Sequence, residues 1–252
     1  MMDDTLLARK VFGCIDNTSL GTTDTDDVII QLCNSSMAMR GSDFGPVAAV
    51  CVYPRYVALA KRLLAGSGIR VATVAGAFPH GQVTTSQKVA EVQAAIASGA
   101  DEVDVVICRS SVLSGDLEAV QNEVSAMKEA CGDHVLKVIL ETGELRTAEN
   151  ISNAARMAIM GGADFVKTST GKSSVGASIE AAEAILRAVA ECASHTGRIV
   201  GFKAAGGIRE AADALRYAHL AARVMGDDYV GKDTFRIGAS SLTRGLYAQL
   251  VS

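Results

Sequence analysis

The 252-residue chain is 49% hydrophobic and 21% charged, a composition that supports a large core and excludes global disorder. Its net charge of −4 argues against nucleic acid or an anionic membrane as the main partner. The six cysteines form no C-x-x-C pair, the N-terminus lacks the profile of a signal peptide, and no apolar run is long enough to span a membrane. We therefore expect a reduced, cytoplasmic protein.

Short β-rich runs alternate with longer amphipathic stretches along the whole chain. We predict eight strands, over residues 10–16, 47–53, 69–75, 102–108, 135–141, 163–169, 199–203 and 234–238. The predicted helices cover residues 24–39, 54–65, 84–98, 116–130, 147–160, 178–193, 211–225 and 241–250. Eight βα units without a linker or repeat predict one α/β domain over residues 1–252, a single (β/α)8 TIM barrel. A doubly wound open sheet is the alternative, but no G-x-G-x-x-G follows the first strand.

Two lysines end separate apolar runs and lead directly into glycine-rich loops. Lys167 lies in Phe-Val-Lys-Thr-Ser-Thr-Gly-Lys, and Lys203 lies in Gly-Phe-Lys-Ala-Ala-Gly-Gly. A buried ammonium is unfavourable, and a second one ~5 Å away adds roughly 3 kcal/mol at an effective dielectric of ~20. Because a neutral lysine attacks carbonyl groups, the pair predicts Schiff-base chemistry. The spacing does not say which lysine is the nucleophile.

Other ionisable residues lie on the predicted strands. Side chains alternate along a strand, so Glu102 and Asp104 share one face, and Lys137 faces the same interior from the next strand. We interpret Lys137 as a structural ion-pair partner of these carboxylates rather than as a catalytic residue. Further polar residues gather at strand ends, where the active site of a barrel is built: Asp16, Thr18, Cys51 and Glu141.

Glycine-rich loops follow the last three predicted strands. Glycine lets backbone N–H groups approach an anion, and a helix N-terminus favours negative charge. Loops after the last two strands are also the usual phosphate site of such barrels. These loops therefore predict a phosphate site formed by Gly171, Lys172, Gly206, Gly207, Gly238, Ser240 and Ser241.

Five segments together resemble the deoxyribose-phosphate aldolase family. They are Val-Cys-Val-Tyr-Pro (50–54), Asp-Glu-Val-Asp-Val-Val (101–106), Leu-Lys-Val-Ile-Leu-Glu-Thr-Gly (136–143), Lys-Thr-Ser-Thr-Gly-Lys (167–172) and Gly-Phe-Lys-Ala-Ala-Gly-Gly (201–207). They occur in order between about residues 16 and 241. The resemblance implies a class I aldolase without metal or cofactor. Such an enzyme cleaves 2-deoxy-D-ribose 5-phosphate reversibly to acetaldehyde and D-glyceraldehyde 3-phosphate.

The resemblance also implies roles for individual residues. Lys167 would form the Schiff base, Lys203 would lower the pKa of Lys167, and Asp104 would relay protons through water. The glycine loops and Lys172 would hold the 5-phosphate. The rest of the substrate pocket would be lined by Asp16, Thr18, Cys51 and Thr170.

The chain departs from the family pattern in three places. Ala204 stands where many members have proline, residues 75–79 form a longer approach to the Phe-Pro pair, and Cys108-Arg109 is an uncommon end to strand four. Another sugar-phosphate aldolase or a transaldolase is the alternative function. For the assembly, a monomer and a homodimer remain equally open.

Overall fold

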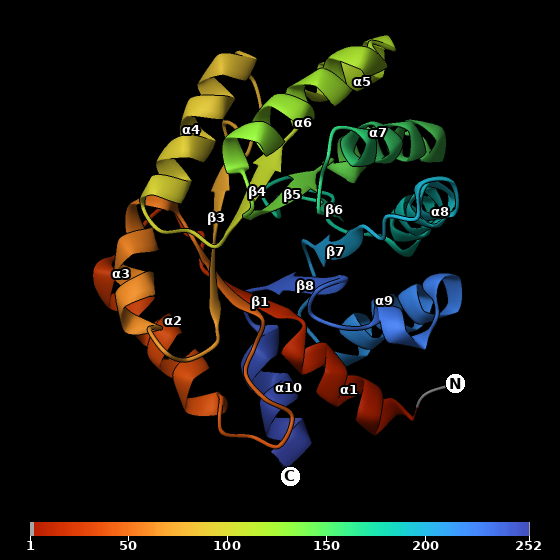
Figure 1. Cartoon of the computed structure of the whole chain (residues 1–252). Helices are drawn as coiled ribbons and strands as arrows, with labels where there is room; N and C mark the ends of the chain where they lie inside the picture. The colour runs from red at the N-terminus through yellow and green to blue at the C-terminus, as the bar shows by residue number, and fades with distance from the viewer. Residues whose placement is uncertain (1–2, 252) are drawn as a thin grey trace.

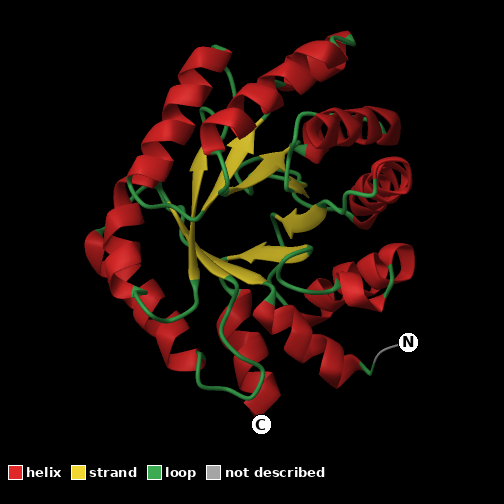
Figure 2. Cartoon of the chain, in the orientation of Figure 1, coloured by secondary structure: helices red, strands yellow, loops and turns green. Residues whose placement is uncertain are grey.

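The computed structural model describes residues 3–251 and shows a closed barrel of parallel strands with helices around it (Figures 1 and 2). The strand order is β1 to β8 in sequence, and β8 pairs with β1 to close the barrel. The (β/α)8 prediction is therefore confirmed, and the open-sheet alternative is wrong. The strands are β1 (Ile15–Thr18), β2 (Ala49–Val52), β3 (Arg70–Ala75), β4 (Glu102–Val106), β5 (Val135–Ile139), β6 (Phe165–Lys167), β7 (Gly201–Ala205) and β8 (Phe235–Ala239).

The helices surround the sheet and bury their apolar faces against it. Local capping supports them; for example, Thr84 accepts from the backbone N–H of Gln87 while the Gln87 side chain accepts from that of Thr84. The α-helices are α1 (Asp4–Gly13), α2 (Asp26–Met39), α3 (Val57–Leu63), α4 (Thr85–Ala97), α5 (Arg109–Ser114), α6 (Leu117–Cys131), α7 (Ala148–Met160), α8 (Ile179–Thr196), α9 (Ala211–Met225) and α10 (Leu242–Val251). Three 3-10 turns are η1 (Pro54–Tyr56), η2 (Thr142–Glu144) and η3 (Asp227–Tyr229). Within residues 3–251, no helix has the length and apolar character needed to cross a bilayer.

The prediction of the first strand was wrong at its start. Residues 10–13 belong to α1, which packs on α9 and α10 near the other end of the chain (Figure 1). Leu7 and Val11 are buried one helical turn apart, and this spacing was a readable helix signal. The apolar run through Phe12 and Ile15 obscured that signal, because periodicity does not separate a short helix from a strand.

The ends of several other strands also differ from the prediction, those of β4 and β5 among them. β4 stops at Val106 because the short helix α5 starts at Arg109, and this helix was not predicted. β5 stops at Ile139, and Glu141 has a φ of 57°, which takes the chain out of the extended conformation. Both changes turn the chain sharply at the end of the barrel where the strands finish.

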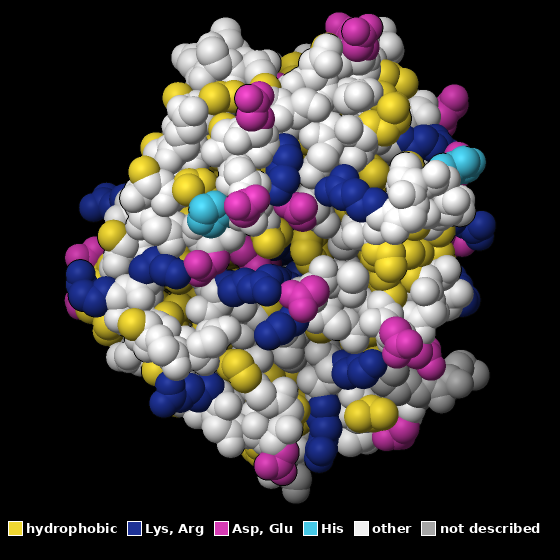
Figure 3. Space-filling view, in the orientation of Figure 1, with side chains coloured by type: hydrophobic (Ala, Val, Ile, Leu, Met, Phe, Trp, Pro, Cys, Tyr) yellow, Lys and Arg dark blue, Asp and Glu magenta, His cyan; other side chains and the backbone are white. Residues whose placement is uncertain are grey.

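The barrel interior is filled largely by charged side chains, whereas the apolar core lies between the strands and the helices. Basic and acidic side chains also gather around the centre of the face in Figure 3. Each strand points alternate residues into the barrel, so the buried charged side chains of the interior come from several strands. They are Asp16, Glu102, Asp104, Lys137, Lys167, Lys203 and Arg236.

Candidate active site

Asp104, on β4, lies between the two lysines singled out from the sequence. Its Oδ2 accepts from Lys167 Nζ at 2.7 Å and from Lys203 Nζ at 2.8 Å, and its Oδ1 accepts from Lys137 Nζ at 2.9 Å. The register of the sheet explains this meeting, because Lys167 stands opposite Lys203 across β6 and β7. Both lysines are buried, at 3% and 1% exposure. The expected closeness of the two ammonium groups is confirmed.

A second layer of ion pairs lies beneath this cluster. Lys203 Nζ donates to Asp16 Oδ2, and Lys137 Nζ lies 2.5 Å from Glu102 Oε2. Arg236, on β8, donates to both oxygens of Glu102, at 2.8 and 3.1 Å, and to Asp16 Oδ1 at 2.5 Å. The interpretation of Lys137 as a partner of the strand-four carboxylates is confirmed.

The fully buried part of this network carries more positive than negative groups. Four basic side chains, Lys137, Lys167, Lys203 and Arg236, face three carboxylates, Asp16, Glu102 and Asp104. At its outer end the network continues to Arg70, which pairs with Glu102 at 3.1 Å and with the exposed Asp233 at 3.0 Å. This outer pair adds one charge of each sign. Buried charge is stable only when paired, so the surplus is relieved if one lysine is neutral.

The surroundings of the two lysines identify the one that becomes neutral. Burial lowers the pKa of Lys167, and Lys203 lowers it further; Asp104, its carboxylate partner, only partly offsets this, so the net shift is downward. Burial also acts on the pKa of Lys203, but Asp104 and Asp16 together outweigh it and raise that pKa. Lys167 therefore has the character of a nucleophile, and Lys203 that of a permanent cation.

The carboxylates and the nearby thiol complete this assignment. Burial alone would raise the pKa of Asp104, but Lys137, Lys167 and Lys203 hold it well below its usual range. Burial raises the pKa of Cys51 to about 11. The thiol is therefore neutral near pH 7 and packs as a small residue beside Ala49 and Ala72.

A cavity of about 440 Å³ opens above Lys167, between the loops that follow β1, β6, β7 and β8. The predicted residues that line it are Thr18, Lys167, Thr170, Gly171, Lys172, Gly206, Gly207, Gly238 and Ser240. The others lie elsewhere: Asp16, Cys51, Asp104 and Lys203 are buried outside its wall, and Ser241 borders a neighbouring cavity. Gly238 also leaves room for the Lys203 side chain, because a Cβ at position 238 would lie 3.0 Å from Lys203 Cε.

The loop after β6 is held by Glu141. The Glu141 carboxylate accepts from the Thr170 hydroxyl, from the Thr170 N–H at 3.3 Å and from Ser173 Oγ at 3.1 Å. Lys172 then reaches across the cavity, and its Nζ donates to the Leu20 carbonyl in the loop after β1. A single buried carboxylate thus positions the loop that carries the predicted phosphate contacts.

Comparison with known proteins places the chain in a family. The sequence model described as "DeoC/LacD family aldolase" matches residues 16–243. The chain belongs to this aldolase family. A Caenorhabditis elegans protein named "Putative deoxyribose-phosphate aldolase" is 43% identical over 237 residues, covering 93% of this chain and 78% of that protein.

Solved structures agree with this family. A Coccidioides immitis protein that carries the same name is 31% identical, with a TM-score of 0.81; the match covers 96% of this chain and 86% of that one. Deoxyribose phosphate aldolase from Aeropyrum pernix, described as having a unique tetrameric structure, is 30% identical, with a TM-score of 0.72. That match covers 99% of this chain and 93% of the other.

Sequence reasoning missed two arginines of the aldolase. Arg209 lines the cavity just after Gly206 and Gly207, and an arginine two residues beyond a glycine pair was a readable signal for an anion site. Arg236 shares the inward parity of Gly238 on β8, so strand alternation could have placed it in the barrel.

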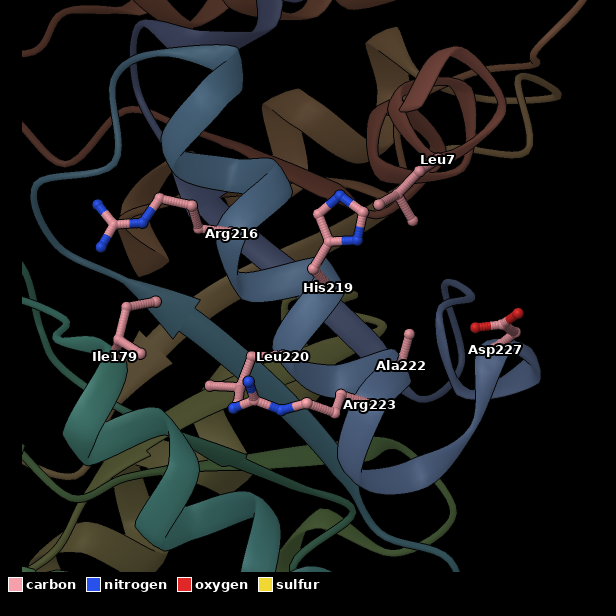
Figure 4. A pocket seen from close by; sticks show the side chains of 8 residues that line it. All are labelled: Leu7, Ile179, Arg216, His219, Leu220, Ala222, Arg223 and Asp227. Atoms are coloured by element: carbon pink, nitrogen blue, oxygen red, sulfur yellow. The ribbon is translucent and has the colours of Figure 1, made fainter. Parts of the chain in front are cut away.

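A larger cavity, of about 580 Å³, lies on the outside of the aldolase barrel (Figure 4). Arg216, His219 and Arg223 project from α9 toward it, and His219 Nε2 lies 2.9 Å from Asp4 Oδ1. None of its eight labelled lining residues is a lysine, so this cavity does not offer Schiff-base chemistry. Across residues 3–251, no group of three or more His, Cys, Asp or Glu side chains is arranged to hold a metal ion.

Proposed function

We propose that this aldolase is a class I deoxyribose-phosphate aldolase that forms its Schiff base on Lys167. It cleaves 2-deoxy-D-ribose 5-phosphate reversibly to acetaldehyde and D-glyceraldehyde 3-phosphate. The observation that carries the proposal is the contact of one Asp104 oxygen with both Lys167 and Lys203 below an open cavity. The name of the relative that is 43% identical supports the choice of substrate.

The first half of the reaction uses the neutral amine of Lys167. Its nitrogen attacks C1 of the open-chain sugar, and the carbonyl oxygen takes up a proton to give a carbinolamine. Loss of that hydroxyl as water leaves a protonated imine. Asp104, 2.7 Å from Lys167 Nζ, passes the protons through a water molecule, while Lys203 stays charged.

The imine then acts as the electron sink for carbon–carbon cleavage. The C3 hydroxyl loses its proton, the C2–C3 bond breaks, and its electron pair moves toward the imine nitrogen. D-Glyceraldehyde 3-phosphate leaves, and an enamine of two carbons remains on Lys167. Protonation of the enamine at C2 and addition of the water lost earlier release acetaldehyde and restore the amine.

The phosphate binds at the rim of the cavity, away from the reacting carbons. Gly171, Gly206 and Gly207 each have a positive φ, which turns their backbone toward conformations that suit an anion-binding loop. Lys172 and Arg209 add positive charge there. Ser240 and Ser241 stand just before α10, where the helix N-terminus favours the anion.

Reductive trapping tests the proposal. The protein is incubated with 2-deoxy-D-ribose 5-phosphate and borohydride, and the adduct is located by peptide mass spectrometry. We expect a reduced adduct on Lys167. An adduct on Lys203 would reverse the two roles, and no adduct would remove the Schiff-base mechanism. An adduct that forms only with a different sugar phosphate would favour another aldolase or a transaldolase.

We further propose that residues 1–252 act as one cytoplasmic aldolase domain in the degradation of deoxyribonucleotides. It binds a small sugar phosphate rather than nucleic acid or a membrane, as the net charge of −4 supports. It needs no metal or cofactor and is a monomer or a homodimer. Light scattering of the purified protein measures the assembly, and a tetramer, as described for the Aeropyrum pernix protein, would contradict this part.

A further inference from the structure

Arg236 is a fully buried guanidinium that does not reach the cavity. Its side chain has 0% exposure, and it is absent from the residues that line the cavity above Lys167. Its Nη1 bridges Asp16 Oδ1 at 2.5 Å and Glu102 Oε2 at 3.1 Å, and its Nη2 donates to Glu102 Oε1 at 2.8 Å. The arginine therefore occupies both oxygens of one carboxylate and one oxygen of the other.

The carboxylate partners of Arg236 also contact the lysines. Asp16 Oδ2 accepts from Lys203, and Glu102 Oε2 lies 2.5 Å from Lys137 Nζ. Lys203 in turn shares Asp104 Oδ2 with Lys167. A continuous series of ion pairs thus joins the floor of the barrel to the nucleophile.

We propose that Arg236 is a positioning residue that sets the charge balance of the lysine cluster by holding Asp16 and Glu102. The guanidinium keeps these two carboxylates from neutralising the lysines fully. The network therefore retains one surplus positive charge, which is removed when Lys167 gives up its proton. This inference deepens the proposed function and rests on Lys167 being the nucleophile.

The proposal makes opposite predictions for two neutralising substitutions. Arg236→Met leaves three lysines facing three carboxylates, so a protonated Lys167 becomes balanced. Glu102→Gln leaves four basic groups facing two carboxylates, so the surplus grows and Lys167 loses its proton more readily. The double variant has three lysines and two carboxylates, which restores the original surplus of one.

Other groups that face Lys167 stay the same in these variants. Asp104 on β4 contacts Lys167. Lys203 on β7 and Lys137 on β5 both bind the Asp104 carboxylate as well. Burial raises the pKa of the Cys51 thiol on β2 to about 11, so the thiol is mostly neutral across the range tested. Asp16 on β1 keeps its contact with Lys203.

The experiment measures two rates between about pH 5 and pH 10. One is the rate at which the imine formed by Lys167 and acetaldehyde is trapped by cyanoborohydride, and the other is kcat/KM for sugar cleavage. For the wild type, we expect both to rise with pH as Lys167 becomes neutral. We expect the midpoint to move up by about one pH unit or more in Arg236→Met and down in Glu102→Gln. Each unit changes the rate on the acid side about tenfold.

Two control variants separate charge from packing. Arg236→Lys retains the positive charge, and we expect its midpoint to stay near that of the wild type. The double variant Arg236→Met/Glu102→Gln is expected to return the midpoint toward the wild-type value. If Arg236→Met does not fold, the expected downward shift in Glu102→Gln and the unshifted midpoint in Arg236→Lys still test the proposal.

The possible outcomes divide clearly. Midpoints that move in the same direction, or rates that fall equally at every pH, would overturn the role of Arg236 and leave it as a packing residue. Absence of an adduct on Lys167 in the wild type would instead refute the proposed function itself. Trapping on Lys167 with no opposed shifts refutes only the inference.

Discussion

Lys167 and Lys203 are the same residue type on neighbouring strands, yet their surroundings differ. Lys167 has one carboxylate partner, Asp104, and lines the cavity. Lys203 has two, Asp104 and Asp16, and lies below the cavity wall. Each added carboxylate stabilises the ammonium form, so the number of carboxylate partners distinguishes the proposed nucleophile, Lys167, from the proposed cation, Lys203.

Replacing Lys203 by Leu should weaken catalysis by raising the pKa of Lys167. The loss of one positive charge lets Asp104 and Asp16 stabilise the Lys167 ammonium, which cannot attack a carbonyl. We expect kcat to fall roughly 10²-fold or more near pH 7, with part of the rate restored at higher pH. The measurement is the pH dependence of kcat for 2-deoxy-D-ribose 5-phosphate cleavage.

Lys167→Leu is the matched control for this variant, because removal of the amine itself leaves nothing for high pH to restore. It should be inactive at every pH. A Lys203→Leu protein whose activity stayed low and flat up to about pH 10 would show that Lys203 does more than supply charge.

Metal removal should leave the activity unchanged. Electrons flow to a lysine imine in the proposed mechanism, so no Lewis acid is required. We expect full kcat/KM after exhaustive treatment with a chelator and dialysis. Activity that is lost and then restored by zinc or another divalent ion would favour a metal-dependent mechanism.

At the level of elements, the loops after β6 and β7 form one wall of the cavity. Ala177 N–H donates to the Gly206 carbonyl at 3.0 Å, and a Cβ on Gly176 would lie only 2.3 Å from that oxygen. Glycine at these positions therefore permits the two loops to pack backbone against backbone. Movement of either loop would displace the other and reshape the rim that is proposed to hold the phosphate.

Gly207→Val should damage phosphate binding selectively. Gly207 is exposed on the cavity rim, and a Cβ there meets no protein atom within 4 Å, so the new side chain would enter the space given to the phosphate. We expect a severe loss of kcat/KM for 2-deoxy-D-ribose 5-phosphate and a much smaller loss for unphosphorylated deoxyribose. Both substrates are compared in wild type and variant.

Gly197→Val gives a control for backbone strain. Gly197 also has a positive φ and free space around its Cβ, but it caps the C-terminus of α8 rather than lining the cavity. We expect it to affect the two substrates equally. Equal fractional losses in Gly207→Val would mean that the loop shapes the catalytic centre and that the phosphate assignment is wrong.

The sequence predicted the order of the elements better than their ends. Strand alternation placed Asp104, Lys137, Lys167 and Lys203 in one interior, because an inward parity persists along a strand. It did not reveal that Glu141 leaves the strand and turns its carboxylate to the next loop. That role depends on the positive φ and on Thr170, a contact between distant segments that no local pattern encodes.

On the scale of the whole molecule, much of the barrel interior is a buried polar network, whereas most of the apolar core lies between the strands and the helices. The free energy of unfolding should therefore decrease in acid. Burial alone would raise the pKa of Glu102, but Lys137 and Arg236 outweigh it and lower that pKa to about 2, from an ordinary value of 4.5. The stabilisation is complete above about pH 4.5 and is lost as the pH falls toward 2.

Glu102→Gln should reveal this dependence. At pH 7 we expect the variant to be less stable by roughly 3 kcal/mol, because Lys137 and Arg236 lose a buried partner. The difference from wild type should shrink by about 1.4 kcal/mol for each pH unit below 4.5, because Glu102 takes up a proton in the unfolded wild-type chain while it stays ionised in the folded one until about pH 2. Urea unfolding at several pH values measures it, and a difference that does not change with pH would contradict the assignment.

The buried charged side chains beneath Lys167 and Lys203 also affect the order in which the products leave. Lys137, Glu102 and Arg236 close the lower end of the barrel, so molecules enter and depart through the opening at the upper end. In the proposed reaction, the phosphate-bearing aldehyde lies nearer that opening, whereas the two-carbon fragment is still bonded to Lys167 at the bottom of the cavity. We therefore expect sequential release, with the three-carbon aldehyde leaving first. In heavy water, we expect the methyl group of acetaldehyde to acquire its deuterium only after the three-carbon aldehyde has left and solvent has entered the cavity.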